Sequence, residues 1–275
     1  MSDDRDAPEE VAAPAPPEED DGAAPAPPEA DYTPEDVDPD RFRVGPSRLS
    51  SPGEAISVSV GVTLATGVVI TFAFDPHRAG TPAMLIAIGL FYAVIGAFAL
   101  RRLDQRGELR SRFRPASGDF TLGAVVAGTL YGAAHLVGQL VAKHGTIREA
   151  WIMRVYLQIG DPNAPGHVVV GAAVFFIAAL DELVWRGLVM RTLEAVYGAR
   201  RALIATSLLF ATAHLPTLYL LRDPTAGWNP LIVLAALGCG TVWGLVYLRT
   251  SRLVPALFAH ALFSWALIEF PIWRP

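Results

Sequence analysis

The chain places two acidic residues and an arginine inside a stretch that is otherwise apolar enough to cross a membrane. Asp181 and Glu182 are adjacent, and Arg186 follows one helical turn later, within residues 167–190. A charged side chain at bilayer depth costs roughly 2.5–3.5 kcal/mol on insertion scales, so such residues are rarely kept without a use. The group either neutralises itself between helices or forms a polar site inside a helix bundle, and we favour the second interpretation.

Two later apolar runs carry histidines at helical spacing from another residue. Phe210 and His214 are four residues apart, as are His260 and Ser264, so each pair lies on one face of a helix. A lone histidine in a membrane helix is more often a hydrogen-bonded packing residue than a ligand. We interpret His135 in this way, because no charged residue accompanies it. His214 and His260 differ, because they come from separate helices in the half of the chain that holds the carboxylates.

These residue types could hydrolyse an amide bond in two ways. Two imidazoles and one carboxylate can hold a zinc ion with water as the fourth ligand, and the candidate ligands are Glu182, His214 and His260. Alternatively, a carboxylate and one histidine activate water directly, while the other histidine donates to the developing oxyanion. The residues leave zinc and the metal-free mechanism both open.

Membrane helices must position these residues. The chain has 275 residues, of which 52% are hydrophobic and 18% are charged, against about 25% charged in soluble domains. Seven apolar runs approach the roughly 20 residues that a helix needs to cross a bilayer. We therefore predict an all-α polytopic membrane protein with about seven transmembrane helices. The predicted spans are 54–74, 82–100, 119–141, 167–190, 202–221, 230–248 and 253–271.

The first 40 residues differ in composition from the rest. They contain 15 of the 27 acidic residues and nine prolines. Such a segment cannot bury enough apolar surface to offset the entropy lost on ordering. We predict a disordered acidic Pro/Ala-rich tail over residues 1–50, N-terminal transmembrane helices over 51–150 and a catalytic transmembrane domain over 151–275.

The arginines predict the orientation. The loop 101–114 holds six of them, and cytoplasmic loops carry an excess of Lys and Arg. With this loop in the cytoplasm, the arginines before the first span, after the fourth and after the sixth fall on the same side, so the N-terminus is cytoplasmic. All but one of the 22 basic residues are arginines. That bias is typical of a GC-rich genome and favours a bacterial inner membrane.

Three motifs in the last four spans resemble one known family. Residues 181–187, DELVWRG, resemble the EExxxR motif of the CPBP family, the CAAX proteases and bacteriocin-processing enzymes also called Abi proteins. Residues 210–214, FATAH, resemble its FxxxH motif, and residues 260–264, HALFS, resemble its HxxxN motif. The resemblance covers residues 165–270 and implies an all-helical intramembrane endopeptidase of the type II CAAX endopeptidase kind.

The same resemblance implies a role for each residue. The carboxylate at the start of the first motif activates water together with His214. His260 and residue 264 stabilise the oxyanion, and Arg186 orients the acidic pair. The chain departs from the family at Asp181, where Glu is usual, and at Ser264, where Asn is usual. An Asp carboxylate sits back by roughly 1 Å. The family pattern favours Asp181 as the base, side-chain reach favours Glu182, and between the two we slightly prefer Glu182. A serine hydroxyl still donates a hydrogen bond, over a shorter reach.

Two other classes of function would use similar residues. A transporter or proton relay also needs intramembrane charges, but it spreads them along a path and often contains paired repeats. Here the first two spans have no charged residue in their interiors, and no repeat relates the two halves. A catalytically inactive scaffold of the same family would look the same from sequence. As a protease, the chain would act on a membrane-anchored protein or peptide within the bilayer and would bind no nucleic acid.

Overall fold

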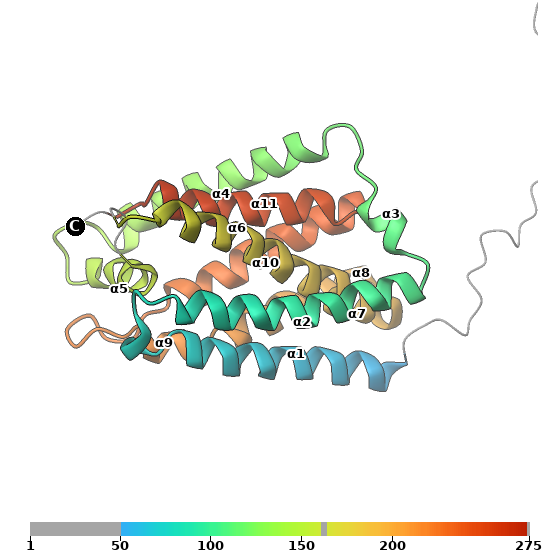
Figure 1. Ribbon diagram of the computed structural model, residues 1–275, viewed down its shortest axis with the longest axis horizontal. Coiled ribbons are helices and arrows are strands. Elements are labelled where there is room, and N and C mark those ends of the chain that lie inside the picture. The colour runs from blue at the N-terminus through green and yellow to red at the C-terminus, as the bar shows by residue number, and fades with distance from the viewer. Residues whose placement is uncertain (1–50, 161–163, 274–275) are drawn as a thin grey trace, which may run out of the picture. The chain divides into compact units, whose positions relative to one another are not determined.

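The structure is a bundle of apolar helices. The computed structural model describes residues 51–160 and 164–273, which belong to one compact unit. Of these described residues 79% are helical and none lies in a strand (Figure 1). The prediction of an all-α polytopic membrane protein is confirmed. The predicted tail over 1–50 falls outside the described residues, and the boundary at residue 150 stays a prediction.

Each predicted span corresponds to an apolar helical segment. Within the described ranges, six segments are long and apolar enough to cross a membrane, and α11 is apolar but shorter. The chain is therefore an integral membrane protein. The segments are α1 (Pro52–Ala73), α2 (Ala83–Gln105), α4 (Asp119–Val141), α6 to α7 (His167–Tyr197), α8 to α9 (Ala199–Leu220), α10 (Leu231–Thr250) and α11 (Val254–Glu269).

Local sequence explains where several helices begin and end. At the start of α1, Ser51 Oγ accepts a hydrogen bond from Glu54 N–H at 3.1 Å, and Pro52 follows the cap, where its missing N–H costs nothing. The predicted span 202–221 is one continuous helix only in part. Pro216 has no N–H to donate, so α8 (Ala199–Ala213) ends before it and α9 (Pro216–Leu220) begins there.

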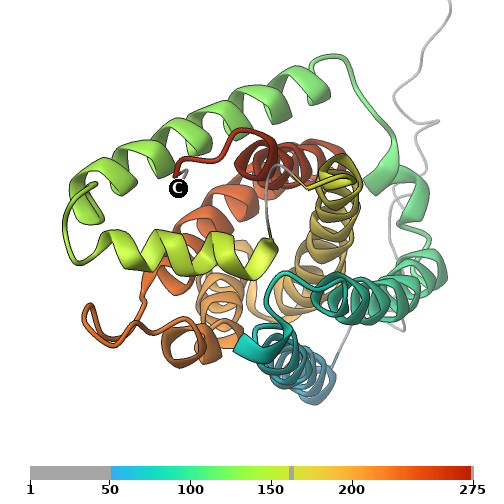
Figure 2. The same ribbon diagram turned by 60° about the vertical axis from the view of Figure 1, so that its left-hand side comes forward.

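Two helices were not predicted, because they are too short to cross a membrane. They are α3 (Leu109–Phe113) and α5 (Glu149–Ile159). Figure 2 shows α5 lying across the end of the bundle at which α4 ends and α6 begins. Gln158 Nε2 donates to Ala73 O at 2.9 Å, and Asn229 Nδ2 donates to Trp151 O at 2.8 Å. These bonds fasten α5 to the end of α1 and to the loop before α10.

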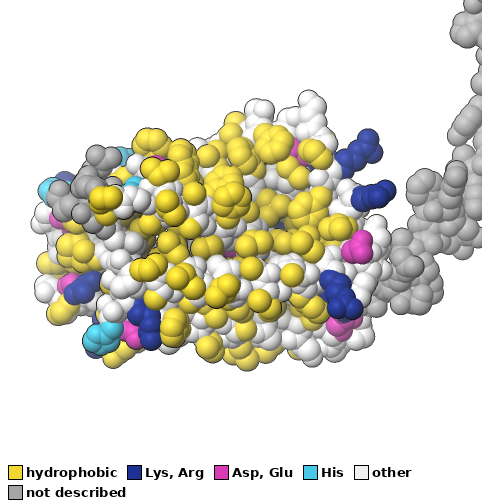
Figure 3. Space-filling model, in the orientation of Figure 1, with side chains coloured by type: hydrophobic (Ala, Val, Ile, Leu, Met, Phe, Trp, Pro, Cys, Tyr) yellow, Lys and Arg dark blue, Asp and Glu magenta, His cyan; other side chains and the backbone are white. Residues whose placement is uncertain are grey.

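Basic residues gather at one end of the bundle. The start of α1, the loop 101–114, the α7–α8 turn and the α10–α11 turn all lie at this arginine-rich end (Figure 1). Apolar side chains cover the middle of the face drawn in Figure 3, and Lys and Arg side chains lie towards its ends. The arginines of these segments are Arg101, Arg102, Arg106, Arg110, Arg112, Arg114, Arg191, Arg200, Arg201, Arg249 and Arg252. Their common end agrees with the predicted alternation of the spans.

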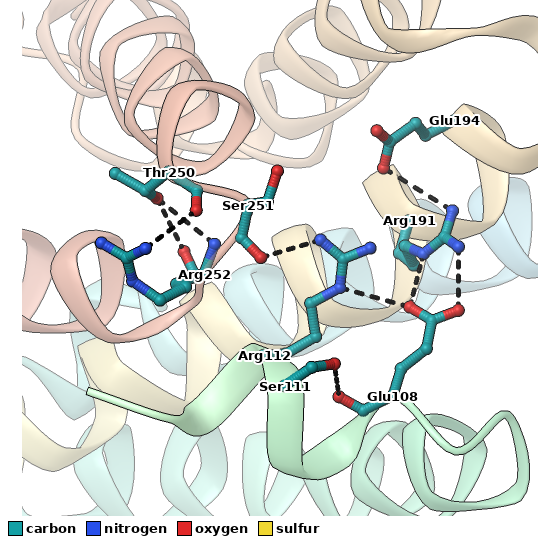
Figure 4. Close-up of polar contacts among 8 residues, drawn as sticks. All are labelled: Glu108, Ser111, Arg112, Arg191, Glu194, Thr250, Ser251 and Arg252. Atoms are coloured by element: carbon teal, nitrogen blue, oxygen red, sulfur yellow. Dashed lines mark hydrogen bonds and ion pairs between the residues drawn. The ribbon is translucent and has the colours of Figure 1, made fainter. Parts of the chain in front are cut away.

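Ion pairs at the arginine-rich end fasten α3 to the second half of the bundle. Glu108 accepts two hydrogen bonds from Arg191, at 2.6 and 2.8 Å, and one from Arg112 at 3.2 Å (Figure 4). Arg112 also donates to Ser251 O at 2.8 Å. Burial raises the pKa of Glu108, but the hydrogen bonds and charges of both arginines outweigh it and hold the pKa below its usual value. Glu108 is therefore charged at neutral pH and holds α3 against α7 (Arg191–Tyr197).

Candidate active site

The two carboxylates lie at an irregularity in their helix. Asp181 and Glu182 are the last residues of α6 (His167–Glu182), which continues directly into a π-helical segment, η5 (Leu183–Met190). Asp181 is 6% exposed, Glu182 is fully buried, and all eight residues of η5 are buried. π-Helical turns carry i to i+5 hydrogen bonds and frequently occur at functional sites. The change of helix type follows the candidate catalytic residues immediately, which fits a site whose side chains must be aimed.

Glu182 and Arg186 form a fully buried ion pair. Arg186 Nη1 lies 2.7 Å from Glu182 Oε1, and neither side chain is exposed. The other terminal nitrogen of Arg186 donates to the carbonyl oxygen of Gly240 on α10. A larger residue would not fit at Gly240, because a Cβ there would lie 2.9 Å from the Phe210 ring and 3.5 Å from Arg186. The predicted pairing of Glu182 with Arg186 is confirmed, and it extends to a third helix.

His260 on α11 joins this pair. Its Nδ1 lies 3.1 Å from Glu182 Oε1 and 3.7 Å from Asp181 Oδ2. The imidazole stacks on the indole ring of Trp243, with ring centroids 3.7 Å apart and planes inclined by 19°. Because Nδ1 faces the carboxylates, Nε2 points away from them and remains available to a ligand. Ser264 follows one turn later on the same face of α11 and is half-buried.

His214 directly follows the last residue of α8 and does not contact the carboxylates. Its Nδ1 lies 2.8 Å from the Phe210 carbonyl oxygen, and its ring meets the Phe210 ring edge-on at 4.7 Å. No hydrogen bond or ion pair joins His214 to Asp181 or Glu182 in the described part of the chain. The structure thus brings Asp181, Glu182, Arg186 and His260 into direct contact and leaves His214 beside them.

Two aromatic residues that were not identified from the sequence lie beside the carboxylates and Arg186. Trp243 is 2% exposed and also lies near Arg186, whose guanidinium carbon is 5.8 Å from the indole centroid. Tyr92 on α2 is 5% exposed, lies next to Asp181 and accepts a 3.5 Å hydrogen bond from Trp185. Both sit in apolar runs, where an aromatic side chain is ordinarily a packing residue, so no sequence signal distinguished them.

Several buried polar atoms of the cluster have no hydrogen-bond partner among the described residues. They are Asp181 Oδ1, Glu182 Oε2, Arg186 Nε and Trp243 Nε1. A buried polar group left without a partner costs about 1–3 kcal/mol, so a purely structural cluster would be expected to satisfy them. One oxygen of each carboxylate is therefore open to a ligand or a reacting water.

The predicted zinc ligands do not assemble into one metal site in this arrangement. No group of three His, Cys, Asp or Glu that could hold a metal ion occurs in residues 51–160 and 164–273. Glu182 and His260 are adjacent, but Glu182 Oε1 is engaged by Arg186. His214 is bonded to Phe210 instead of joining them. A catalytic zinc ion needs its histidine and carboxylate ligands about 2.0–2.2 Å away, and these three side chains do not converge on one point in that way.

His135 takes no part in the cluster. Its side chain is exposed on α4, which packs mainly against α11. The histidine was predicted to be a packing residue, but it lies on the outer face of the bundle, where a helix inside a bilayer meets lipid. Its separation from the carboxylates makes His135 a suitable control position.

Comparison with protein families agrees with the geometry. Residues 163–266 match the family model described as type II CAAX prenyl endopeptidase Rce1-like. These residues form an Rce1-like domain of the CAAX protease family. The Rce1-like domain runs from the start of α6 through most of α11 and contains all three motifs, so the resemblance seen over 165–270 is confirmed. Neither the curated proteins nor the solved structures contain a match to the chain.

Proposed function

We propose that the chain is an intramembrane endopeptidase that hydrolyses a peptide bond of a membrane-associated protein or peptide near its C-terminal anchor. The observation that carries this proposal is the buried contact among Asp181, Glu182, Arg186 and His260 inside the Rce1-like domain. Charges at this depth are expensive, and here each carboxylate keeps one oxygen without a protein partner. Such a cluster suits the activation of water next to an apolar substrate.

Asp181 is the general base in this proposal. Side-chain reach favours Glu182, and both carboxylates keep one oxygen without a protein partner, Asp181 Oδ1 and Glu182 Oε2. Glu182, however, is tied to Arg186 and His260 through Oε1, and an adjacent positive charge makes a carboxylate the weaker base. Asp181 takes a proton from water, and the water oxygen attacks the carbonyl carbon of the scissile bond. The proton then passes to the amide nitrogen as the C–N bond breaks, which leaves a carboxylic acid and an amine.

The histidines and Ser264 support this reaction. Because His214 Nδ1 donates to the Phe210 carbonyl, its neutral ring keeps Nε2 as an acceptor that assists in taking the proton from water. His260, protonated on both ring nitrogens with its Nδ1–H held by Glu182, donates through Nε2–H to the oxyanion that forms on the substrate carbonyl, and Ser264 donates to it through its hydroxyl. Glu182, fixed by Arg186, orients His260.

His214→Ala and His260→Ala should each abolish the appearance of new peptide ends in cells that carry the gene, with the amount of membrane-inserted protein near normal. Each substitution removes a group from the proton transfer or from the oxyanion site. Membrane and secreted proteomes compared between wild type and variant would reveal both the substrate and the loss. His135→Ala should behave as wild type. If both histidine variants process substrate at the wild-type rate, the protease proposal fails and the transporter or inactive-scaffold interpretation takes its place.

We further propose a bacterial inner-membrane location with a cytoplasmic N-terminus, since the arginine-rich end should face the cytoplasm. Reporter domains fused after Arg106 and after Ala164 should then report the cytoplasmic and the external side, respectively. The two positions lie at opposite ends of the bundle. Reporters on the same side, or on the reversed sides, would contradict the orientation.

A further inference from the structure

A row of buried hydroxyl groups leads from the arginine-rich end towards the carboxylates. Ser59 and Thr66 on α1 are 2% and 1% exposed, and Thr206 on α8 is 1% exposed. The hydroxyl oxygens of Ser59 and Thr206 have no hydrogen-bond partner among the described residues, and the Thr66 hydroxyl makes no bond within α1 but interacts with the Tyr92 hydroxyl. We call Ser59, Thr66 and Thr206 the hydroxyl row.

These hydroxyls differ from the other threonine hydroxyls in the same helices. In a membrane helix a Ser or Thr hydroxyl ordinarily bonds to the carbonyl one turn earlier. Thr63 does so with Ser59 O at 2.7 Å, and Thr212 does so with Leu208 O at 2.8 Å. Thr63 even lies between Ser59 and Thr66 on the same buried face of α1. The hydroxyl row thus leaves a local bond unmade, which indicates that its oxygens serve another partner.

The packing of α1 on α8 sets the depth of Ser59 and Thr206 relative to each other. Gly67 lies against Ala213, because a Cβ on Gly67 would be 3.6 Å from the Ala213 carbonyl oxygen. Both helices begin at the arginine-rich end (Figure 1). Thr206 precedes Ala213 by seven residues and Ser59 precedes Gly67 by eight, so each hydroxyl lies about two helical turns before the contact of Gly67 with Ala213. Thr206 and Ser59 therefore lie at a similar depth in the bundle.

The row continues to the candidate base. Thr66 and Asp181 both lie next to the side chain of Tyr92. Counted from Pro52 at 1.5 Å per residue, Ser59 lies about 10 Å and Thr66 about 20 Å from the arginine-rich end of α1. The order along this route is Ser59 with Thr206, then Thr66, then Tyr92, then Asp181.

We infer that the hydroxyl row is a binding site for water, which supplies Asp181 from the arginine-rich end. Hydrolysis consumes one water molecule for each bond cut, and the lipid-facing sides of the helices cannot provide it. Water donates and accepts hydrogen bonds and is thus a fitting partner for unpaired buried hydroxyls. The binding of water stands on the geometry alone, whereas its use in catalysis rests on the proposed function.

Radical footprinting by brief X-ray irradiation tests the water site without any substrate. Irradiation converts bound water to hydroxyl radicals, which oxidise the side chains beside it. Tyr92 is 5% exposed and Trp185 is fully buried, so radicals from bulk solvent should not reach them. We expect oxidation of both residues in the wild-type protein in vesicles and a marked decrease in the double variant Thr66→Val, Thr206→Val. Thr63→Val, which removes a hydroxyl already bonded within the helix, should leave the labelling unchanged.

Turnover supplies the second arm of the test. Thr66→Val should lower turnover about tenfold, the effect of one hydrogen bond lost from a delivered water, with KM unchanged, while Thr63→Val should match the wild type. Wild-type labelling without cleavage of any substrate would leave the water site standing and overturn the proposed function. Absent labelling of Tyr92 and Trp185, or labelling and turnover equal in all variants, would overturn the water site even where cleavage is intact.

Discussion

Asp181→Asn is expected to lower turnover by about 100–10,000-fold, the usual contribution of a general base. The amide keeps the shape of the carboxylate but cannot accept the proton from water. Asp181 makes no close hydrogen bond to Arg186, so its neutral replacement should leave the buried pair of Glu182 and Arg186 intact. Turnover of the substrate found by proteomics, measured with purified protein in vesicles, gives the effect, and the thermal transition of the same samples checks the fold.

Glu182→Gln provides the matched comparison. It removes a charge one residue away, yet its expected defects include a loss of stability, since Arg186 would lose its charged partner in a buried site. If Asp181→Asn cleaves at the wild-type rate while Glu182→Gln is stable but inactive, then Glu182 is the general base and Asp181 is not.

Arg186→Ala should lower both the amount of folded protein in membranes and the activity. Removing one partner of a buried ion pair typically costs about 3–5 kcal/mol, because the remaining charge stays buried without compensation. Arg186 also donates to the Gly240 carbonyl, so the substitution releases α10 from η5 as well. Abundance on membrane blots and thermal unfolding in detergent would measure the loss.

Arg186→Lys separates the two contributions of the arginine. A lysine keeps the positive charge but lacks the second planar donor group that reaches Gly240, so intermediate abundance is expected. Normal abundance with full activity of Arg186→Ala would show that the arginine neither stabilises nor orients the acidic pair.

The parts of this site that could be predicted from sequence are those in which charge breaks an apolar run. Asp181, Glu182 and Arg186 stand out for this reason, and their spacing predicts the pair that the structure contains. The approach of His260 to that pair followed from the resemblance of its motif to the CAAX proteases. Apart from a few polar contacts such as the one between His260 and Glu182, α11 is joined to α6 by packing that no local sequence pattern specifies.

Other features leave no comparable trace in a single sequence. The stacking of Trp243 on His260 involves an aromatic residue in an apolar helix, which resembles any packing residue. The π-helical segment η5 changes the hydrogen-bond register without a Pro or Gly cluster to mark it. The position of α5 across the bundle depends on side-chain bonds from Gln158 and Asn229 to distant carbonyls. The break at Pro216, by contrast, could have been predicted from the residue itself, although the predicted span 202–221 ran through it.

The central claim is that the cluster around Asp181 cuts a peptide bond with water. The most direct measurement is mass spectrometry of the substrate after incubation with the purified protein in vesicles prepared in water labelled with heavy oxygen. We predict one cut in the substrate, a single labelled oxygen in the new carboxyl group, and no product with Asp181→Asn or His260→Ala. An uncut substrate with the wild-type protein, or a product formed equally by both variants, would contradict the account.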